Sequence, residues 1–262
     1  MKSFRTSILL LVLTSGVVGC ASDQVTQKKL EDSKMALEQK QFDSSITSAD
    51  AVIAKQGSGS DTAAAYYLKG RSLEQREKAN PSMSASDLEM AKVNYNRALQ
   101  FAPPKKLEGY IRTSLANVDY FQDDFSAAFE EWSKAYDLLS EPDLKAWTLY
   151  RIGLSQQRMG RFEQADKTFL QVQNQFPNTE QAARSRERHG ARGFQVQLAT
   201  FKNPKSADAA VAELKQQGVN PTRTGDATGL TVIRVGPVAT YAEAKRLKER
   251  FADKYADAII LP

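Results

Sequence analysis

The side chains best able to do chemistry are scarce in this sequence. Its 262 residues include one cysteine, Cys20, and one histidine, His189, so the chain can form neither an internal disulfide nor a Cys/His metal cluster. Adjacent carboxylates such as Asp123-Asp124 fall in a region of helical spacing, where nothing else supports a glycosidase pair. Motifs for a serine nucleophile, a zinc protease or a phosphate-binding loop do not occur. We therefore predict that the protein is not an enzyme and has no catalytic residue, metal or cofactor.

Cys20 follows a segment typical of a secretory signal. Lys2 and Arg5 precede an apolar run over residues 8–18 that ends in small residues, which is the order of charge, apolar core and cleavage site in a signal peptide. A helix needs about 20 apolar residues to cross a bilayer core of about 30 Å, so this run is too short to be a retained span. We expect export and cleavage.

The junction Val17-Val18-Gly19-Cys20 resembles the lipobox of bacterial lipoproteins. The resemblance implies a lipoprotein signal peptide over residues 1–19, a lipidated tether over 20–24 and acylation of Cys20, with palmitate among the chains. Several acyl chains on one residue exceed what stable anchoring requires, so we expect the mature protein to be held on a membrane. Ala21, where an aspartate would direct such a protein to the inner membrane, implies the outer membrane, facing the periplasm. The alternative is an ordinary signal peptide that happens to end near a cysteine.

Composition and charge exclude two classes of protein. With 41% hydrophobic and 26% charged residues, the chain is not a disordered polyelectrolyte. The net charge of +5 falls to +3 without residues 1–19, and this remainder belongs to residues 193–262, where ten basic residues face seven acidic ones. Phosphate neutralisation needs a denser cluster of positive charge. We therefore expect no nucleic-acid partner.

Between about residues 24 and 189, apolar residues recur at the spacing of amphipathic helices. A repeat within this region is clearest in the copy that contains Leu149, Ile152, Gly153, Gly160-Arg161-Phe162, Ala165, Phe169, Val172 and Pro177. This pattern resembles the tetratricopeptide repeat (TPR), which pairs a small residue on its first helix with small and aromatic residues on its second. The small residue lets the two helices approach closely, and the aromatic ring fills the space to the next repeat.

Earlier copies repeat this pattern at an offset of 37 residues, which places Trp132 and Tyr95 where the clearest copy has Phe169. A degenerate first copy contains Phe42, and we expect all four rings to be core between repeats. An insertion over residues 78–86 predicts an extended loop, with Ser86 or Asp87 capping the next helix. The sequence therefore predicts a TPR helical solenoid over residues 25–189, with a concave groove for a protein partner.

After His189 the apolar spacing changes to two, where Phe194, Val196 and Leu198 alternate with polar residues in a half-buried strand. Further elements follow: a helix capped by Ser206 and stopped at Gly218, strands over 221–224 and 230–235, a helix from a Thr240/Glu243 capping box through Tyr255, and a strand over 258–261. The order βαββαβ predicts a four-stranded antiparallel sheet with both helices on one face. The fold class is thus α+β multidomain, an all-α TPR solenoid followed by this small domain.

The segments 194–201 and 232–237 resemble the SPOR domain, the sporulation-related repeat of bacterial cell-wall proteins, and the resemblance covers residues 190–262. It implies that the helix-free sheet face binds peptidoglycan glycan strands lacking stem peptides, which are enriched at the division septum. Gln197 and Thr200 match ligand-facing positions of the family, whereas Leu230 and Val232 replace its aromatic and Arg. Strand parity puts Arg234 on the same face as Leu230 and Val232, where we expect it to substitute for that Arg. The candidate glycan-binding residues are Gln195, Gln197, Thr200, Leu230, Val232 and Arg234.

Two main functions remain open from the sequence. The first is a non-catalytic, membrane-anchored lipoprotein that binds glycan through the SPOR domain and recruits an envelope or division protein in the TPR groove, in envelope maintenance or division. The alternative is a TPR scaffold of an outer-membrane assembly or Tol-Pal-like complex with little glycan binding. An accessory to a wall hydrolase would differ from the first only in the occupant of the groove.

Overall fold

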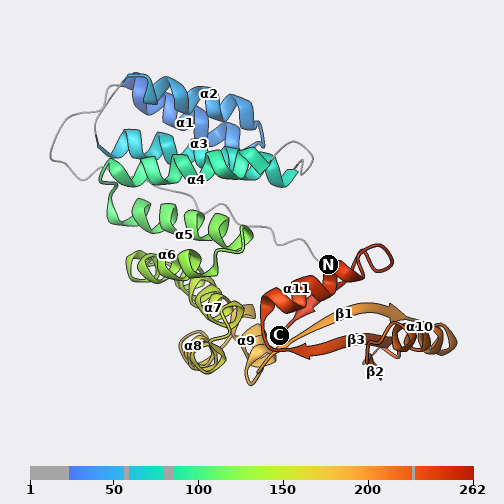
Figure 1. Cartoon of the computed structure of the whole chain (residues 1–262). Helices are drawn as coiled ribbons and strands as arrows, with labels where there is room; N and C mark the ends of the chain where they lie inside the picture. Colours follow the sequence, from blue (N-terminus) through green and yellow to red (C-terminus); the bar gives the residue numbers. More distant parts are fainter. Residues whose placement is uncertain (1–23, 56–58, 80–84, 226–227) are drawn as a thin grey trace. The chain divides into compact units, whose positions relative to one another are not determined.

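The computed structural model describes residues 24–55, 59–79, 85–225 and 228–262 (Figure 1). The predicted signal peptide and the predicted lipidation site Cys20 lie outside the described residues. The described chain forms two units, one containing the residues up to Gln122 with Asp137–Leu139 and the other Asp123–Tyr136 with Ser140–Pro262. Each unit is described by itself below.

The first unit consists of helices that each pack against the next. These are α1 (Gln24–Glu38), α2 (Phe42–Ile53), α3 (Ser60–Ala79), α4 (Ala85–Gln100) and α5 (Lys105–Phe121). Gly70 of α3 lies against the fully buried ring of Tyr95 in α4, and a Cβ at Gly70 would come within 2.6 Å of the ring carbon Cε1. The small residue therefore allows the close approach of the two helices that the repeat pattern predicts.

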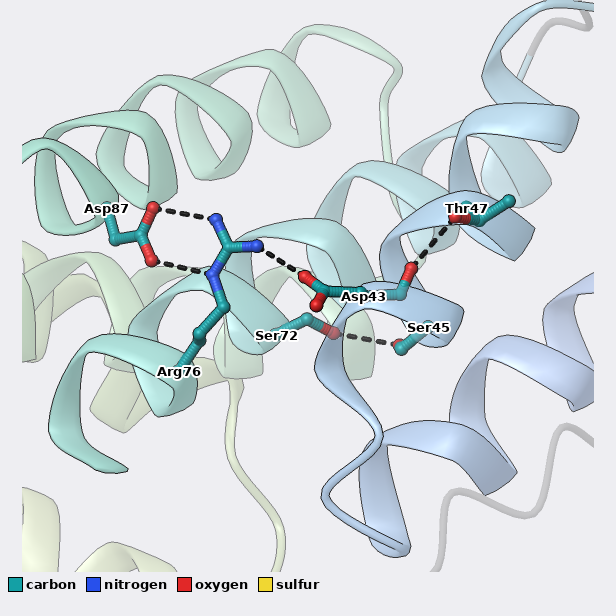
Figure 2. Close-up of polar contacts among 6 residues, drawn as sticks. All are labelled: Asp43, Ser45, Thr47, Ser72, Arg76 and Asp87. Carbon is teal, nitrogen blue, oxygen red and sulfur yellow. Dashed lines mark hydrogen bonds and ion pairs between the residues drawn. The ribbon is translucent and has the colours of Figure 1, made fainter. Parts of the chain in front are cut away.

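Polar contacts hold the crossings of α1, α2 and α3. Ser33, Ser45 and Ser72 are buried, and the Ser45 hydroxyl donates to the Ser33 carbonyl at 2.8 Å while Ser72 donates to the Ser45 hydroxyl at 2.8 Å. Arg76 of α3 donates to both carboxylate oxygens of Asp87 in α4, at 2.8 and 2.9 Å, and to Asp43 of α2 at 2.5 Å (Figure 2). One guanidinium thus links three helices.

The insertion between α3 and α4 is shorter than the sequence predicts. α3 continues to Ala79 and α4 begins at Ala85, so the prediction that Ser86 or Asp87 caps α4 is wrong. Both residues lie in the first helical turn, where the negative charge of Asp87 suits the helix dipole. Asp87 is instead held by Arg76.

The second unit begins with four helices of the repeat region. They are α6 (Phe125–Leu138, of which residues 137–138 belong to the first unit), α7 (Pro142–Arg158), α8 (Phe162–Gln175) and α9 (Glu180–Arg188). A Cβ at Gly153 of α7 would lie 2.5 Å from Cε1 of Phe169 in α8, the same arrangement as at Gly70. Three of the four predicted core rings, Tyr95, Trp132 and Phe169, are fully buried. Phe42, at the start of α2, is only half-buried, so that part of the prediction is wrong.

α9 closes the repeat region. Thr179 caps it, accepting a hydrogen bond from the Ala182 backbone N–H at 3.2 Å. The helix packs against α7 and α8. Its last residue, Arg188, donates to the Tyr150 hydroxyl at 3.0 Å and accepts from the Gln157 side chain through its carbonyl at 2.9 Å.

The remaining residues form a βαββαβ domain, as predicted. Its elements are β1 (Phe194–Phe201), α10 (Pro204–Gln216), β2 (Thr222–Gly225), β3 (Thr231–Val238), α11 (Tyr241–Arg250) and β4 (Ile259–Leu261). The sheet order is β2-β3-β1-β4 with every pair antiparallel. One core gathers Phe194, Val196 and Leu198 of β1 with Leu214 of α10 and Ala244 of α11, so both helices cover the same face.

Two helix boundaries in this domain differ from the prediction. α10 begins at Pro204 and is capped by Asn203, whose side chain accepts from the Lys205 backbone N–H at 2.9 Å, so Ser206 is not the cap. Proline suits the first helical position because its missing N–H has no helical partner there. The Thr240/Glu243 capping box of α11 is confirmed, but α11 ends at Arg250 rather than continuing through Tyr255.

Candidate functional site

The helix-free face of the sheet carries a row of four side chains, one from each strand. Strand pairing sets Thr222 of β2 opposite Arg234 of β3, Arg234 opposite Gln197 of β1, and Gln197 opposite Ile259 of β4. Directly opposed residues of antiparallel strands share a face and lie close together. Because Ile233 and Val235 belong to the helix-covered core, Arg234 between them faces the open side, and the row crosses that face.

A β-bulge brings Thr200 beside Gln197. The register of β1 against β3 shifts between Gln197 and Ala199, so that Thr200 pairs with Val232. Without the extra residue, strict alternation would place positions 197 and 200 on opposite faces. The bulge therefore puts the two predicted ligand-facing residues on the same surface.

Weak hydrogen bonds orient this group. Arg234 donates from Nε to the Gln197 amide oxygen at 3.3 Å, and the Gln197 amide nitrogen donates to the Thr200 hydroxyl at 3.4 Å. Both distances exceed the usual 2.9–3.0 Å of a good N–H···O bond. Arg234 carries four further N–H groups beyond Nε. The three side chains are thus pre-oriented, and a ligand could replace their mutual bonds at little cost.

The other predicted site residues lie differently. Gln195 is on the open face opposite Leu261 of β4. Val232 lies between Thr200 and Thr224 on that face but is only 4% exposed, so it offers a ligand little surface. Leu230 precedes β3 and is half-buried. The structure therefore brings together Gln197, Thr200 and Arg234, with Gln195 in the adjacent row.

A hollow of about 510 Å³ adjoins this group and was not foreseen from the sequence. Residues 197–200 of β1, residues 254–257 and Ile259 line it. β4 pairs only with Gln195–Gln197, so β1 extends past its neighbour at this point. Ile259, 48% exposed, adds an apolar surface. Ala258 is buried, and successive residues of a strand point to opposite faces, so the sequence pattern could have predicted that Ile259 lies on the open face.

The charges around the hollow are partly engaged. Lys254 at its rim pairs with Glu213 of α10, and this hydrogen bond raises the pKa of Lys254 above its ordinary value. Asp257 lies on the same rim. Apart from these two charged residues, the hollow is lined by one side-chain amide, two hydroxyls and apolar side chains, which suit a neutral polar ligand.

A glycine within β3, close to its end, shapes the strand there. Gly236 has φ +111°, and an added Cβ would lie 2.9 Å from the Phe194 carbonyl oxygen. Only glycine adopts this backbone conformation and approach without strain. The Val-Gly-Pro segment thus fixes the second register shift of β1 against β3, between Phe194 and Val196.

The first of the adjacent carboxylates Asp123-Asp124 is engaged in an ion pair. Asp123 pairs with Lys245 of α11 at 2.5 Å. Within the described ranges, no cluster of His, Cys, Asp and Glu could hold a metal ion. None of the helices in the described part of the chain is long and apolar enough to cross a bilayer.

These features define a helical-repeat protein with a small C-terminal domain, in which helices cover one face of a four-stranded antiparallel sheet. Residues 190–262 match the family model described as "SPOR domain", and residues 147–179 match the model described as "Tetratricopeptide repeat". The chain therefore carries TPR repeats and a C-terminal SPOR domain. A SPOR domain implies peptidoglycan binding and a place in the periplasmic envelope, whereas TPR repeats imply protein partners. Both domain families are non-catalytic.

The chain was also compared with curated proteins and with solved structures. No curated protein matches the chain. The N-terminal domain of stress-induced protein-1 (STI-1) from C. elegans is 20% identical, with a TM-score of 0.41 over 49% of this chain and 94% of that one. The MamA protein is 13% identical, with a TM-score of 0.49 over 74% of this chain and 92% of that one.

Proposed function

We propose that this protein is a non-catalytic envelope tether. Its sheet binds peptidoglycan glycan strands that lack stem peptides, while its TPR groove recruits an envelope or division protein. Acylated Cys20 anchors the mature chain to the outer membrane, on the periplasmic side. Enrichment at the division septum follows from the ligand, since stripped glycan is concentrated there.

The observation that carries the glycan assignment is the group Gln197, Thr200 and Arg234 on the helix-free face. Glycan backbones present hydroxyls and acetamides, which are neutral donors and acceptors. The amide, hydroxyl and guanidinium of this group offer both kinds of partner side by side. The adjoining hollow and the exposed Ile259 add room and apolar contact for an acetyl methyl group. No step of this recognition needs an acid or a base.

The proposal is tested by co-sedimentation of residues 21–262 with wall sacculi, before and after an amidase has removed the stem peptides. We expect stronger binding to the stripped sacculi. Gln197→Glu removes the amide donors and sets a carboxylate against Arg234, so affinity should fall about tenfold, which corresponds to about 1.4 kcal/mol.

Arg223→Gln is the matched control. Arg223 pairs in register with Ile233 and forms an ion pair with Asp208 of α10 at 3.5 Å, so it belongs to the helix-covered face. Arg223→Gln and Arg234→Gln each remove one positive charge, so the two variants have the same net charge. Arg234→Gln should weaken binding and Arg223→Gln should not. Equal loss in both variants would mean that binding follows net charge rather than the proposed surface.

The burial of Val232 favours a second candidate, the TPR scaffold with little glycan binding. This side chain is only 4% exposed, and it stands where the resemblance to the SPOR family implies a ligand-binding group. If neither preparation of sacculi retains the wild-type chain, the scaffold is the better assignment. Cross-linking of the lipidated protein in intact envelopes would then identify what the repeats hold.

A further inference from the structure

Aromatic rings connect the last repeat helices to the SPOR domain within the second unit. Phe162 is the first residue of α8 and Phe194 the first residue of β1, and their ring centroids are 5.5 Å apart. Phe125, the first residue of α6, meets Tyr241, the first residue of α11, edge-on at 5.2 Å. Phe194 and Tyr241 are 5.8 Å apart. These four residues, called the ring cluster below, therefore form a continuous chain across the boundary of the two domains.

The ring cluster is part of the SPOR core rather than a surface contact. Phe194 is fully buried, and Phe162 packs against the same core as Leu198 and Ile233 although it belongs to a repeat helix. Phe125 is 9% exposed. A repeat helix thus supplies a side chain that completes the hydrophobic core of the sheet domain.

The two phenylalanines of the repeats occupy equivalent positions. Phe125 and Phe162 are 37 residues apart, the repeat offset, and each opens the second helix of its repeat. Phe42 opens α2 in the same way and is half-buried. In the last two repeats this position is used to dock the SPOR domain.

Charged groups surround the ring cluster on several sides. The guanidinium of Arg158, the last residue of α7, lies 4.0 Å from the centroid of the Tyr241 ring, within the range of a cation–π interaction. Lys245 of α11 pairs with Asp123 in the turn before α6 at 2.5 Å. Asp166 of α8 accepts from Arg192 at 2.8 Å and from the Gly190 backbone N–H at 2.9 Å, which ties the connecting segment to the repeat helix.

From these contacts we infer that the SPOR domain is rigidly docked on the last repeats through the ring cluster, and does not swing on a flexible linker. The docking leaves the candidate glycan surface open, because Phe194 lies on the helix-covered face of β1 whereas Gln195 and Gln197 lie on the other. A glycan strand bound there therefore fixes the orientation of the repeats α6–α8. The docking of the SPOR domain on the repeats does not depend on whether the sheet binds glycan.

The test measures the distance between two spin labels by double electron–electron resonance. The labels replace exposed Lys167 of α8 and Lys215 of α10 in residues 21–262, which leave out Cys20, the one native cysteine. We expect one narrow distance distribution in the otherwise unchanged chain. A broad distribution would overturn the inference directly.

Charge reversal at the ion pair tests the docking without disturbing the core. Lys245→Asp faces Asp123 with a like charge and should broaden the distribution, and the swapped pair Asp123→Lys with Lys245→Asp should restore the narrow one. Both residues are substantially exposed, so the two domains should remain folded. Failure of the swap to restore the narrow distribution would contradict the contact.

Tyrosine substitutions give an independent comparison. Tyr241→Ala combined with Arg158→Ala removes the cation–π contact and should broaden the distribution. Tyr255→Ala is the matched control, because Tyr255 also packs at the edge of the SPOR core but lies outside the ring cluster. A distribution that is equally narrow in the double variant would refute docking through the rings.

Discussion

Gly153→Ala tests the close approach of α7 and α8 on which the last repeat is built. An alanine Cβ would lie 2.5, 2.8 and 3.1 Å from three carbons of the Phe169 ring. That ring is fully buried and packs against Tyr150 at 5.9 Å between centroids. It cannot move aside without displacing its neighbour, so the clash must be absorbed by the helix pair.

The expected magnitude is the difference of two opposing effects. Alanine is favoured over glycine in a helix interior by about 1 kcal/mol. Overpacking a dense core costs about 1–3 kcal/mol, and three ring contacts this short place Gly153→Ala near the upper end. We expect a net destabilisation of about 2 kcal/mol, or a fall in Tm of about 4–8 °C for a chain of this size.

Tryptophan fluorescence during urea unfolding is a suitable local assay. Both tryptophans of the chain, Trp132 and Trp147, lie in the second unit, in α6 and α7, with ring centroids 5.9 Å apart. Their signal follows the unit that contains Gly153. A protein of two units need not unfold in one step, so a local probe is preferable to a global one.

A double-mutant cycle identifies the cause. Phe169→Leu shortens the side chain that the new methyl group would meet, so Gly153→Ala should cost at least about 1 kcal/mol less in that background. An equal cost in both backgrounds would show that the Phe169 ring is not what requires glycine. A higher urea midpoint for Gly153→Ala alone would refute the reasoning outright.

Three further perturbations test other parts of the structure. Gly236→Ala should destabilise the SPOR domain, because φ is +111° and the new Cβ would lie 2.9 Å from the Phe194 carbonyl oxygen; faster amide exchange in β1 and β3 would confirm it, and unchanged protection would contradict it. Arg76→Met should destabilise the first unit by about 1–3 kcal/mol, since Asp87, only 6% exposed, loses its charged donors; a urea midpoint unchanged by circular dichroism would count against this. Burial opposes ionisation of Asp166, but backbone and guanidinium hydrogen bonds outweigh it and hold its pKa below the ordinary value. A lowered folded-state pKa stabilises the protein above about pH 4 and ceases to do so as the pH falls through it. Asp166→Asn should therefore reduce stability at pH 7, with the gap to wild type closing in more acidic buffer, and a gap independent of pH would refute the assignment.

Local pattern was enough to predict the elements and their partners within each repeat. Gly153 with Phe169 is a sequence signature because both halves of the contact recur at fixed spacing. The Thr240/Glu243 capping box is equally local, since both of its hydrogen bonds lie within one helical turn. The prediction that Ser206 caps α10 is wrong for a related reason: Ser206 and Asn203 are both good capping residues, and only Pro204, which suits the first helical position, favours Asn203.

The candidate site was harder to predict because it depends on register. Thr200 reaches the side of Gln197 only through the bulge of β1, which alternation does not reveal. The burial of Val232 depends on Thr200 and Thr224 from neighbouring strands. The sequence does not predict the ring cluster because its members are far apart in the chain. Each of its phenylalanines already fits the apolar pattern of its own repeat or strand, so nothing in the sequence indicates that they meet.

The position of β4 beside the proposed glycan surface affects how this protein can be labelled for imaging in cells. Leu261 is paired with Gln195, and Pro262 comes directly after it. A fluorescent protein fused at Pro262 would therefore start at the rim of the surface proposed to hold glycan. Such a fusion could block the very ligand whose distribution it is meant to report, and a label on an exposed helix of the repeats, such as Lys167 of α8, avoids that interference.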